Sequence, residues 1–280
     1  MRIKLMADSA CDLPRQLAEE NDIHIIPIVI IKGNEIFRDD VDINRDDIFS
    51  YYEREHRLCT TSALSEYDYI AEFEKFASDY DHIIYICLGS GFSSMCLNAQ
   101  RAAEHFPNVH VVDSRNLTTG SGLIVLRAAD YIRMGLKVGE ILSLLRSLVP
   151  KIRTSFVVNS LDYLAAGGRC SSAAAMGANI LKIKPSIVLS DGVMRVGKKY
   201  KGNLERCVLS YADDVLKDTS VMLPDKIFIT YSVIPEELVE QVREKIEATG
   251  RFKEILLSHT GSTVCCHCGP GTLGIIYVSK

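Results

Sequence analysis

Short apolar runs alternate with amphipathic segments through the first part of the chain. The runs at 82–88 and 109–113 are hydrophobic without interruption, as strands are when both faces of a parallel sheet are covered. Further strands are expected at 2–7 and 23–31, where Pro27 places part of the segment at a sheet edge. Amphipathic helices are expected at 13–20, 45–55, 66–78, 93–105, 118–134 and 138–148. This rhythm predicts an α/β domain whose ligands bind beyond the carboxyl ends of the strands.

The pattern changes after Pro150, where strands follow one another more directly. Strands are expected at 154–158, 185–189, 193–199, 226–232, 254–258 and 273–278. Helices are expected near 171–182, 203–217 and 235–249. The turn Ser190-Asp191-Gly192 joins two strands without a helix, which is typical of a hairpin. The chain is therefore predicted to hold an α/β domain at 1–150 and a smaller α+β domain at 151–280.

Composition and charge restrict the classes of function. The 280 residues are 47% hydrophobic and 24% charged, which is ordinary for a globular protein with a sizeable core. A formal net charge of −4 argues against a protein that binds nucleic acid. Neither a signal peptide nor a membrane span is expected, because the longest apolar run, 25–31, is short and contains Pro27. Nine scattered cysteines fit reduced thiols, so a cytoplasmic location is expected.

The segment CLGSGFSSMC, residues 87–96, stands where an apolar strand ends and a helix is expected to begin. A phosphate loop needs a lysine and a hydroxyl after its glycines, and a dinucleotide-binding loop needs a glycine where Ser94 stands. A hydrolase nucleophile elbow around Ser93 lacks its last glycine, because Met95 occupies that position. Ser93 is instead placed to cap the helix, beside backbone N–H groups that can bind an anion. Plain capping and anion binding both fit this segment.

Two further corners are rich in polar groups. The segment CTTSALS, 59–65, precedes an acidic helix that Ser62 or Ser65 can cap, and capping accounts for only one of its four hydroxyls. The segment ADSACDLP, 7–14, follows the first strand and fits a helix start with Pro14 near the first turn.

The segment AAGGRCSSAAAMGA, 165–178, combines a flexible turn, an arginine and a helix start. Gly167 and Gly168 precede Arg169, and a serine is expected to cap the helix that follows. An arginine beside a helix N-terminus makes a positive spot that suits an anion or an acidic partner. The small residues of this helix either allow close packing or leave room for a ligand.

The segment TVCCHCGPGTLG near the end of the chain contains Cys265 and Cys268 on either side of His267. A closed zinc site needs four ligands, and the sequence offers no second matching pair. A redox motif is expected to open a helix, whereas a glycine–proline turn and a strand follow these cysteines. The turn is expected to project His267 toward a neighbouring site.

Taken together, these segments resemble the DegV family, the fatty-acid-binding subunits of bacterial fatty acid kinase. The likeness spans nearly the whole chain and includes ADSACDLP (7–14), TSALS (61–65), GSGFSSMCLNA (89–99), VVDSRNLTTGSGLIVLRAA (111–129), 156–192 and HCGPGTLG (267–274). It implies a tunnel between two domains that holds a long-chain fatty acid, with no cofactor and no metal.

The resemblance also implies which residues hold the ligand. Thr61 and Ser93 bind its carboxylate and His267 supports them, with Ser62 and Ser94 alongside. Such a clamp is physically reasonable, because a carboxylate in an apolar slot must be hydrogen-bonded to offset its desolvation. The acyl tail then contributes roughly 0.8 kcal/mol per buried CH₂ before ordering costs.

Arg169 and Lys201 are, by the same resemblance, residues that contact the kinase subunit, and relatives carry arginine at the position of Lys201. That subunit phosphorylates the bound carboxyl group, which feeds phospholipid synthesis. The chain itself is expected to catalyse nothing, and a transient contact with a membrane surface is compatible with this function.

Two other functions fit parts of the sequence. A serine hydrolase would use Ser93 as nucleophile and His267 as base, with Asp113 or Asp8 orienting the base, but only geometry can identify such a triad. A phosphosugar or nucleotide binder would use the same anion-binding corners.

Overall fold

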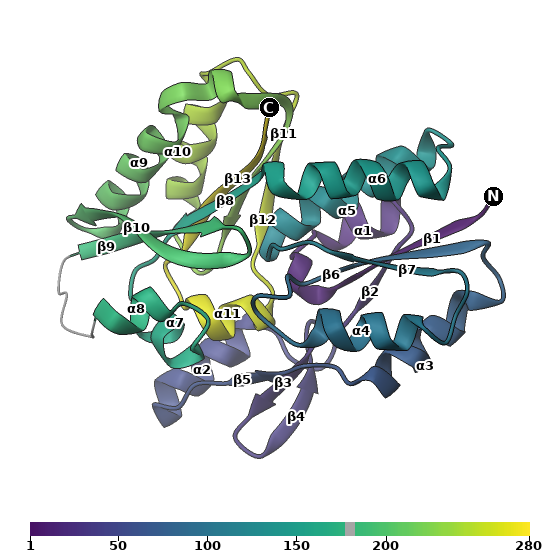
Figure 1. The fold of residues 1–280 in the computed structure, drawn as a ribbon. Coiled ribbons are helices and arrows are strands. Elements are labelled where there is room, and N and C mark those ends of the chain that lie inside the picture. The colour runs from purple at the N-terminus through teal and green to yellow at the C-terminus, as the bar shows by residue number, and fades with distance from the viewer. Residues whose placement is uncertain (177–182) are drawn as a thin grey trace.

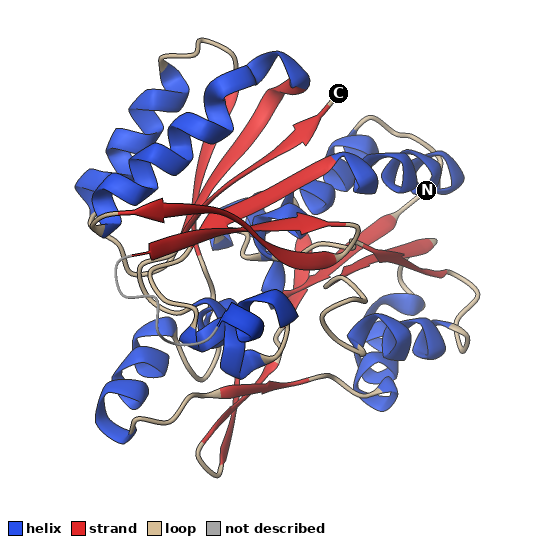
Figure 2. Ribbon diagram, turned by 60° about the vertical axis from the view of Figure 1, so that its left-hand side comes forward, coloured by secondary structure: helices blue, strands red, loops and turns tan. Residues whose placement is uncertain are grey.

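The computed structural model describes residues 1–176 and 183–280, which form three sheets with helices between and around them (Figures 1 and 2). The first sheet is parallel, in the order β2-β1-β6-β7. Its strands are β1 (Ile3–Asp8), β2 (Ile23–Ile26), β6 (His82–Cys87) and β7 (Val109–Asp113). Because these strands are parallel, the loops that follow β1 and β6 lie at the same edge of the sheet.

The side chains of this sheet alternate between two helical layers. The helices are α1 (Arg15–Glu20), α3 (Glu66–Ala77), α4 (Met95–Ala103), α5 (Thr118–Arg133) and α6 (Val138–Leu148). Leu5 of β1 packs in a core with α5 and α6, whereas Met6 packs in a core with α3 and α4. The alternation follows from the two-residue period of a strand.

The second sheet has six strands in the order β10-β9-β8-β13-β11-β12 and is antiparallel except for the β11–β12 pair. Its strands are β8 (Ile152–Val157), β9 (Ile183–Ser190), β10 (Val193–Lys201), β11 (Met222–Tyr231), β12 (Glu254–His259) and β13 (Leu273–Ser279). The predicted hairpin turn joins β9 and β10, and both Asp191 and Gly192 have the positive φ that such a two-residue turn requires.

Helix α5 lies between the two large sheets. Phe228 and Ile276 of the six-stranded sheet share one hydrophobic core with Leu5 of the parallel sheet and Ile124 of α5. The opposite face of the six-stranded sheet is covered by α9 (Leu204–Val215) and α10 (Glu236–Glu247). Figure 1 shows this order of layers, with α9 and α10 on the outer side of the molecule.

The third sheet is small, and Pro27 explains its existence. The predicted strand at 23–31 is two strands that belong to different sheets, because proline has no N–H for a ladder and interrupts the pairing. The small sheet has the order β4-β3-β5, with β3 (Val29–Lys32), β4 (Glu35–Arg38) and β5 (Thr60–Ser62). Helix α2 (Arg45–Glu55) leads from β4 toward β5.

The predicted class is confirmed: a parallel-sheet α/β part precedes a part with a mixed sheet. Two helices were not predicted, α7 (Asp162–Gly167) and α11 (Ser262–Cys268). The predicted helix near 171–182 is present as α8 (Ser171–Met176), and its remainder lies outside the described residues. Short 3₁₀ turns lie at Ser9–Cys11, Val149–Lys151 and Leu216–Val221.

All nine cysteines are free and buried. Among the described residues, no helix has both the length and the apolar character needed to cross a membrane.

Candidate ligand-binding site

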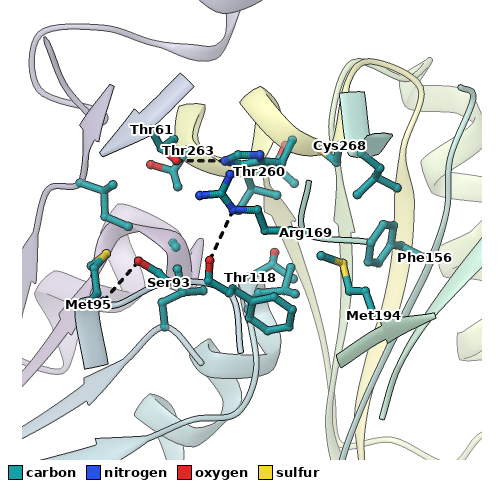
Figure 3. Close-up of a pocket in the computed structure, with 18 of the residues that line it drawn as sticks. Thr61, Ser93, Met95, Thr118, Phe156, Arg169, Met194, Thr260, Thr263 and Cys268 are labelled. Atoms are coloured by element: carbon teal, nitrogen blue, oxygen red, sulfur yellow. Dashed lines mark hydrogen bonds between the residues drawn. The ribbon is translucent and has the colours of Figure 1, made fainter. Parts of the chain in front are cut away.

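A cavity of about 180 Å³ lies where the carboxyl ends of the parallel strands meet the six-stranded sheet. Its apolar wall comes from both halves of the chain and includes Ile28, Leu88, Phe92, Leu117, Phe156, Leu164, Met194 and Ile276. Figure 3 shows Thr61, Ser93 and Met95 on one side of the cavity and Phe156 and Met194 on the other, with Arg169 between them. The cavity therefore combines an apolar interior with polar groups at one side.

The loop after β6 places Ser93 at the cavity. The backbone N–H of Leu88 donates to Asp8 Oδ2 at 2.6 Å, and Ser90 donates to Asp113 through both its backbone and its hydroxyl. These bonds hold the loop against the ends of β1 and β7. Burial raises the pKa of Asp8 to about 6.

The helix after this loop begins later than the sequence predicts. Ser94, not Ser93, occupies the N-cap of α4, and its side chain makes no capping bond. Ser93 Oγ accepts a 3.3 Å hydrogen bond from Met95 N and lines the cavity together with Ser94. Most of the hydrogen-bonding capacity of Ser93 therefore remains available to a ligand.

The same loop is covered by the β9–β10 hairpin from the second half of the chain. A Cβ atom on Gly91 would lie 2.2 Å from the carbonyl oxygen of Gly192, so only glycine fits at this contact. Arg115 donates to the Asp191 carbonyl at 3.2 Å and strengthens the same junction. Met194, two residues beyond the turn, lines the cavity.

Thr61 and Ser62 reach the cavity from β5, whose pairing with β3 fixes their position. The cap of the following helix is Ser65, which accepts from Asp68 N and forms a capping box. One of the two serines that were candidates for this cap is thus confirmed. Thr61 and Ser62 do not cap this helix, and both line the cavity.

Helix α11 brings His267 to the cavity, and buried carboxylates hold the start of this helix. Asp39 accepts from the backbone N–H groups of Ser262 and Thr263, at 2.9 and 3.2 Å, and Asp12 accepts from Gly261 N at 2.9 Å. Such anions compensate the free N–H groups and the dipole of a helix start. The expectation that a turn projects His267 was wrong, because His267 lies in the last turn of a helix.

His267 is a neutral group at this site. Its Nε2 lies 3.0 Å from Thr61 Oγ1, and its Nδ1 is buried with no hydrogen-bond partner among the described residues. Burial, helped by the nearby Arg169 charge, lowers the pKa of His267 to about 4. A Cβ atom on Gly167 would lie 2.5 Å from Nδ1, so this glycine makes room for the imidazole.

Arg169 lines the cavity, where it can contact an anionic ligand, one of the two roles that the sequence left open for it. Its Nη1 donates to the carbonyl oxygen of Gly167 at 2.6 Å, and its Nε lies 3.4 Å from the carbonyl oxygen of Phe92. The arginine thus spans from the α7 end to the loop that carries Ser93. Lys201, at the end of β10, is exposed and is not among the lining residues.

Cys265 is a buried thiol near the cavity. A hydrogen bond with Cys268 and burial raise the pKa of Cys265 well above its usual range. Among the described residues, the one group of three metal-ligating side chains is Cys87, Cys96 and Asp113, whose donor atoms lie within 4.8 Å of one another. The Asp113 carboxylate there already accepts hydrogen bonds from the backbone N–H and hydroxyl of Ser90 and from the backbone N–H of Arg115.

The residues of the hydrolase hypothesis are not assembled into a triad. In the part of the chain that the structure describes, no hydrogen bond joins Ser93 to His267, whose Nε2 contacts Thr61. Asp8 bonds to Tyr85 and the Leu88 backbone, and the Asp113 carboxylate bonds to the loop rather than to the imidazole. Among the described residues, neither of these acids orients His267 as a base.

Comparisons with known proteins identify the family and similar structures. A family model described as an uncharacterised protein of the DegV family matches residues 2–280. A structure titled for the fatty acid binding of a DegV family protein from Thermus thermophilus is 26% identical, with a TM-score of 0.92 and 100% of each chain covered. The structure of DegV from Bacillus subtilis, called a fatty acid binding protein, is 26% identical, with a TM-score of 0.87 over 100% of each chain.

A third solved structure has a similar fold. The fatty acid kinase (Fak) B3 protein of Streptococcus pneumoniae, loaded with linoleic acid, is 21% identical to this chain. Its TM-score is 0.85, and 100% of each chain is covered.

Proposed function

Because the chain belongs to the DegV family, we propose that it binds a long-chain fatty acid in this cavity. Thr61 and Ser93 bind the carboxylate, His267 supports them, and Ser62 and Ser94 line the same end. The observation that carries the proposal is the Thr61–His267 hydrogen bond beside Ser93, at one side of an apolar cavity.

The chemistry of these groups suits an anionic head on an apolar tail. Hydroxyl donors stabilise a buried carboxylate, which is costly to desolvate without them. His267 is neutral near pH 7, so it acts as a hydrogen-bonding group and not as a counter-ion. The positive charge comes from Arg169, whose guanidinium lies at the same cavity.

The ligand is enclosed by two units, residues 1–150 and 151–280, and is presented to a separate kinase subunit. Arg169 and Lys201 contribute to the surface that this subunit contacts. The kinase supplies the phosphoryl group and forms an acyl phosphate for phospholipid synthesis. The chain needs no cofactor and acts as a carrier. The fold likeness to a fatty acid kinase B3 protein supports this part of the proposal.

The experiment that tests fatty acid binding is native mass spectrometry of the chain, expressed in bacteria and purified without detergent. We expect one long-chain acyl group per chain, identified by extraction and mass analysis. The Thr61→Val/Ser93→Ala double variant should retain much less. A wild-type protein that folds but carries no acyl chain, and that binds none when acid is added, contradicts the proposal.

A further inference from the structure

Thr263 carries a hydroxyl group that nothing in the described structure satisfies. The residue is 6% exposed and lines the cavity, where Figure 3 shows it near Thr61 and Thr260. Thr263 Oγ1 is buried with no hydrogen-bond partner among the described residues. A buried hydroxyl without a partner is costly, so native proteins rarely keep one without a ligand or water in contact with it.

The other buried threonines of the cavity differ from Thr263 in this respect. Thr118 donates to Asp12, Thr230 bonds to Thr119, Thr260 bonds to Cys265 and Thr272 donates to the Cys268 carbonyl. Their hydroxyls are therefore used within the protein. Thr263 is left with hydrogen-bonding capacity that no described residue uses, on a residue that lines the cavity.

The position of Thr263 on α11 relates it to the head-group end. Thr263 and His267 are four residues apart, so they lie on the same face of the helix, about one turn or roughly 6 Å apart along its axis. Asp39 holds the backbone N–H of Thr263, which fixes this turn in place. A ligand whose carboxylate lies beside Thr61 and His267 therefore has its first several carbons within reach of Thr263.

We propose that Thr263 Oγ1 binds an oxygen substituent on the acyl chain, so that this protein favours a hydroxylated fatty acid over the plain acid. The proposal rests on the proposed function and specifies its ligand class. A threonine hydroxyl both donates and accepts, so a hydroxyl on the chain can pair with it in either sense. An unsubstituted chain leaves the Thr263 hydroxyl unpaired against methylene groups.

The test compares affinities of the delipidated protein for palmitic acid and for a positional series of monohydroxypalmitic acids. We expect the wild type to bind at least one hydroxy acid about three- to tenfold more tightly than palmitic acid, the effect of one neutral hydrogen bond. Thr263→Val should abolish that preference and leave palmitic acid bound as well as before, or better. Thr263→Ser retains the hydroxyl and should keep the preference.

Thr272→Val is the matched control, because its hydroxyl lines the same cavity but is already bonded within the protein. It should keep the preference for the hydroxy acid. The proposal is overturned if the wild type prefers no hydroxy acid, or if the preference survives in Thr263→Val. It is also overturned if Thr263→Val weakens all acids equally, since Thr263 would then contact the carboxylate. Failure of the proposed function appears differently, as a wild type that binds no acid at all.

Discussion

His267 Nε2 lies 3.0 Å from Thr61 Oγ1, although 206 residues separate the two in the sequence. Each residue is held by a different anchor: Thr61 by the pairing of β5 with β3, and His267 by the carboxylates at the start of α11. The hydrogen bond therefore joins the N-terminal and C-terminal parts of the chain at the cavity. Its geometry depends on the whole fold being formed.

The shared bond predicts non-additive effects on ligand affinity. Thr61→Val and His267→Ala should each weaken fatty acid binding by about 1–3 kcal/mol, because each leaves a buried polar group without its partner. The double variant should lose less than the sum, since the two residues act through one contact. Isothermal titration of the delipidated proteins measures all three values.

Ser65→Ala is the control for this cycle. Ser65 caps α3 four residues after Thr61 and does not line the cavity, so its loss should cost about 1 kcal/mol of stability and leave affinity unchanged. Fully additive losses for Thr61 and His267 would mean that they contact the ligand independently.

Ser93→Ala should weaken fatty acid binding by about 1–3 kcal/mol with little change in the free energy of unfolding. The reason is that Ser94 occupies the N-cap position, and Ser93 makes only a 3.3 Å bond to Met95 N. Affinity measurements and urea unfolding separate the two effects. Unchanged affinity with normal folding would move the head group away from this loop.

Gly167→Ala should reduce fatty acid affinity about tenfold without preventing folding. The added Cβ would lie 2.5 Å from His267 Nδ1, so the imidazole must shift and lose its bond to Thr61, at a cost of about 1–2 kcal/mol. Gly139→Ala is the matched control, because open space surrounds that position. A normal affinity in Gly167→Ala would show that the Thr61–His267 contact is dispensable.

The low pKa of His267 predicts a pH-dependent contribution to stability. Its pKa is about 4 in the folded chain and near 6.5 when unfolded, so between these values the unfolded state binds the extra proton. The contribution of the neutral imidazole to the free energy of unfolding is fully present above pH 6.5. It is lost as the pH falls toward 4, by up to about 3 kcal/mol.

Urea unfolding of wild type and His267→Gln across this range isolates that contribution. The wild type should lose stability relative to the variant as the pH falls. Asp8, whose pKa burial raises to about 6, titrates in both proteins and cancels in the difference. A constant difference from pH 7 to 4 would contradict a buried neutral imidazole.

Much of this arrangement could be predicted from local patterns. Continuous apolar runs located β6 and β7, because strand period acts over a few residues. The hydroxyl-rich corners left capping and anion binding open, and the resemblance to the DegV family singled out Thr61 and Ser93, which both line the cavity. Helix α11 could not be found in this way. Its start is stabilised by Asp12 and Asp39, which are more than two hundred residues away in the sequence, and the glycine–proline turn after it concealed its end. Local sequence marked Arg169 as a positive spot, but its place at the cavity brings it to the Phe92 carbonyl, 77 residues away in the sequence.

Charge reversal at Arg169 can change the affinity for the fatty acid, the rate of the kinase step, or both. Among the described lining residues, Arg169 is the one cation, so Arg169→Glu places a carboxylate beside the carboxylate of the ligand. We expect a loss of fatty acid affinity of more than about tenfold, and slower acyl-phosphate formation when a bacterial fatty acid kinase catalytic subunit is added.

Lys201 is exposed and outside the cavity, so Lys201→Glu should leave affinity within about 1 kcal/mol and slow only the kinase step, most strongly at low salt. Lys151→Glu, an exposed change that also lies outside the cavity lining, is the control and should alter neither measurement. If Arg169→Glu slows the kinase step while affinity is unchanged, Arg169 contacts the partner and not the ligand. If Lys201→Glu changes neither quantity, the contact surface for the kinase lies elsewhere on the molecule.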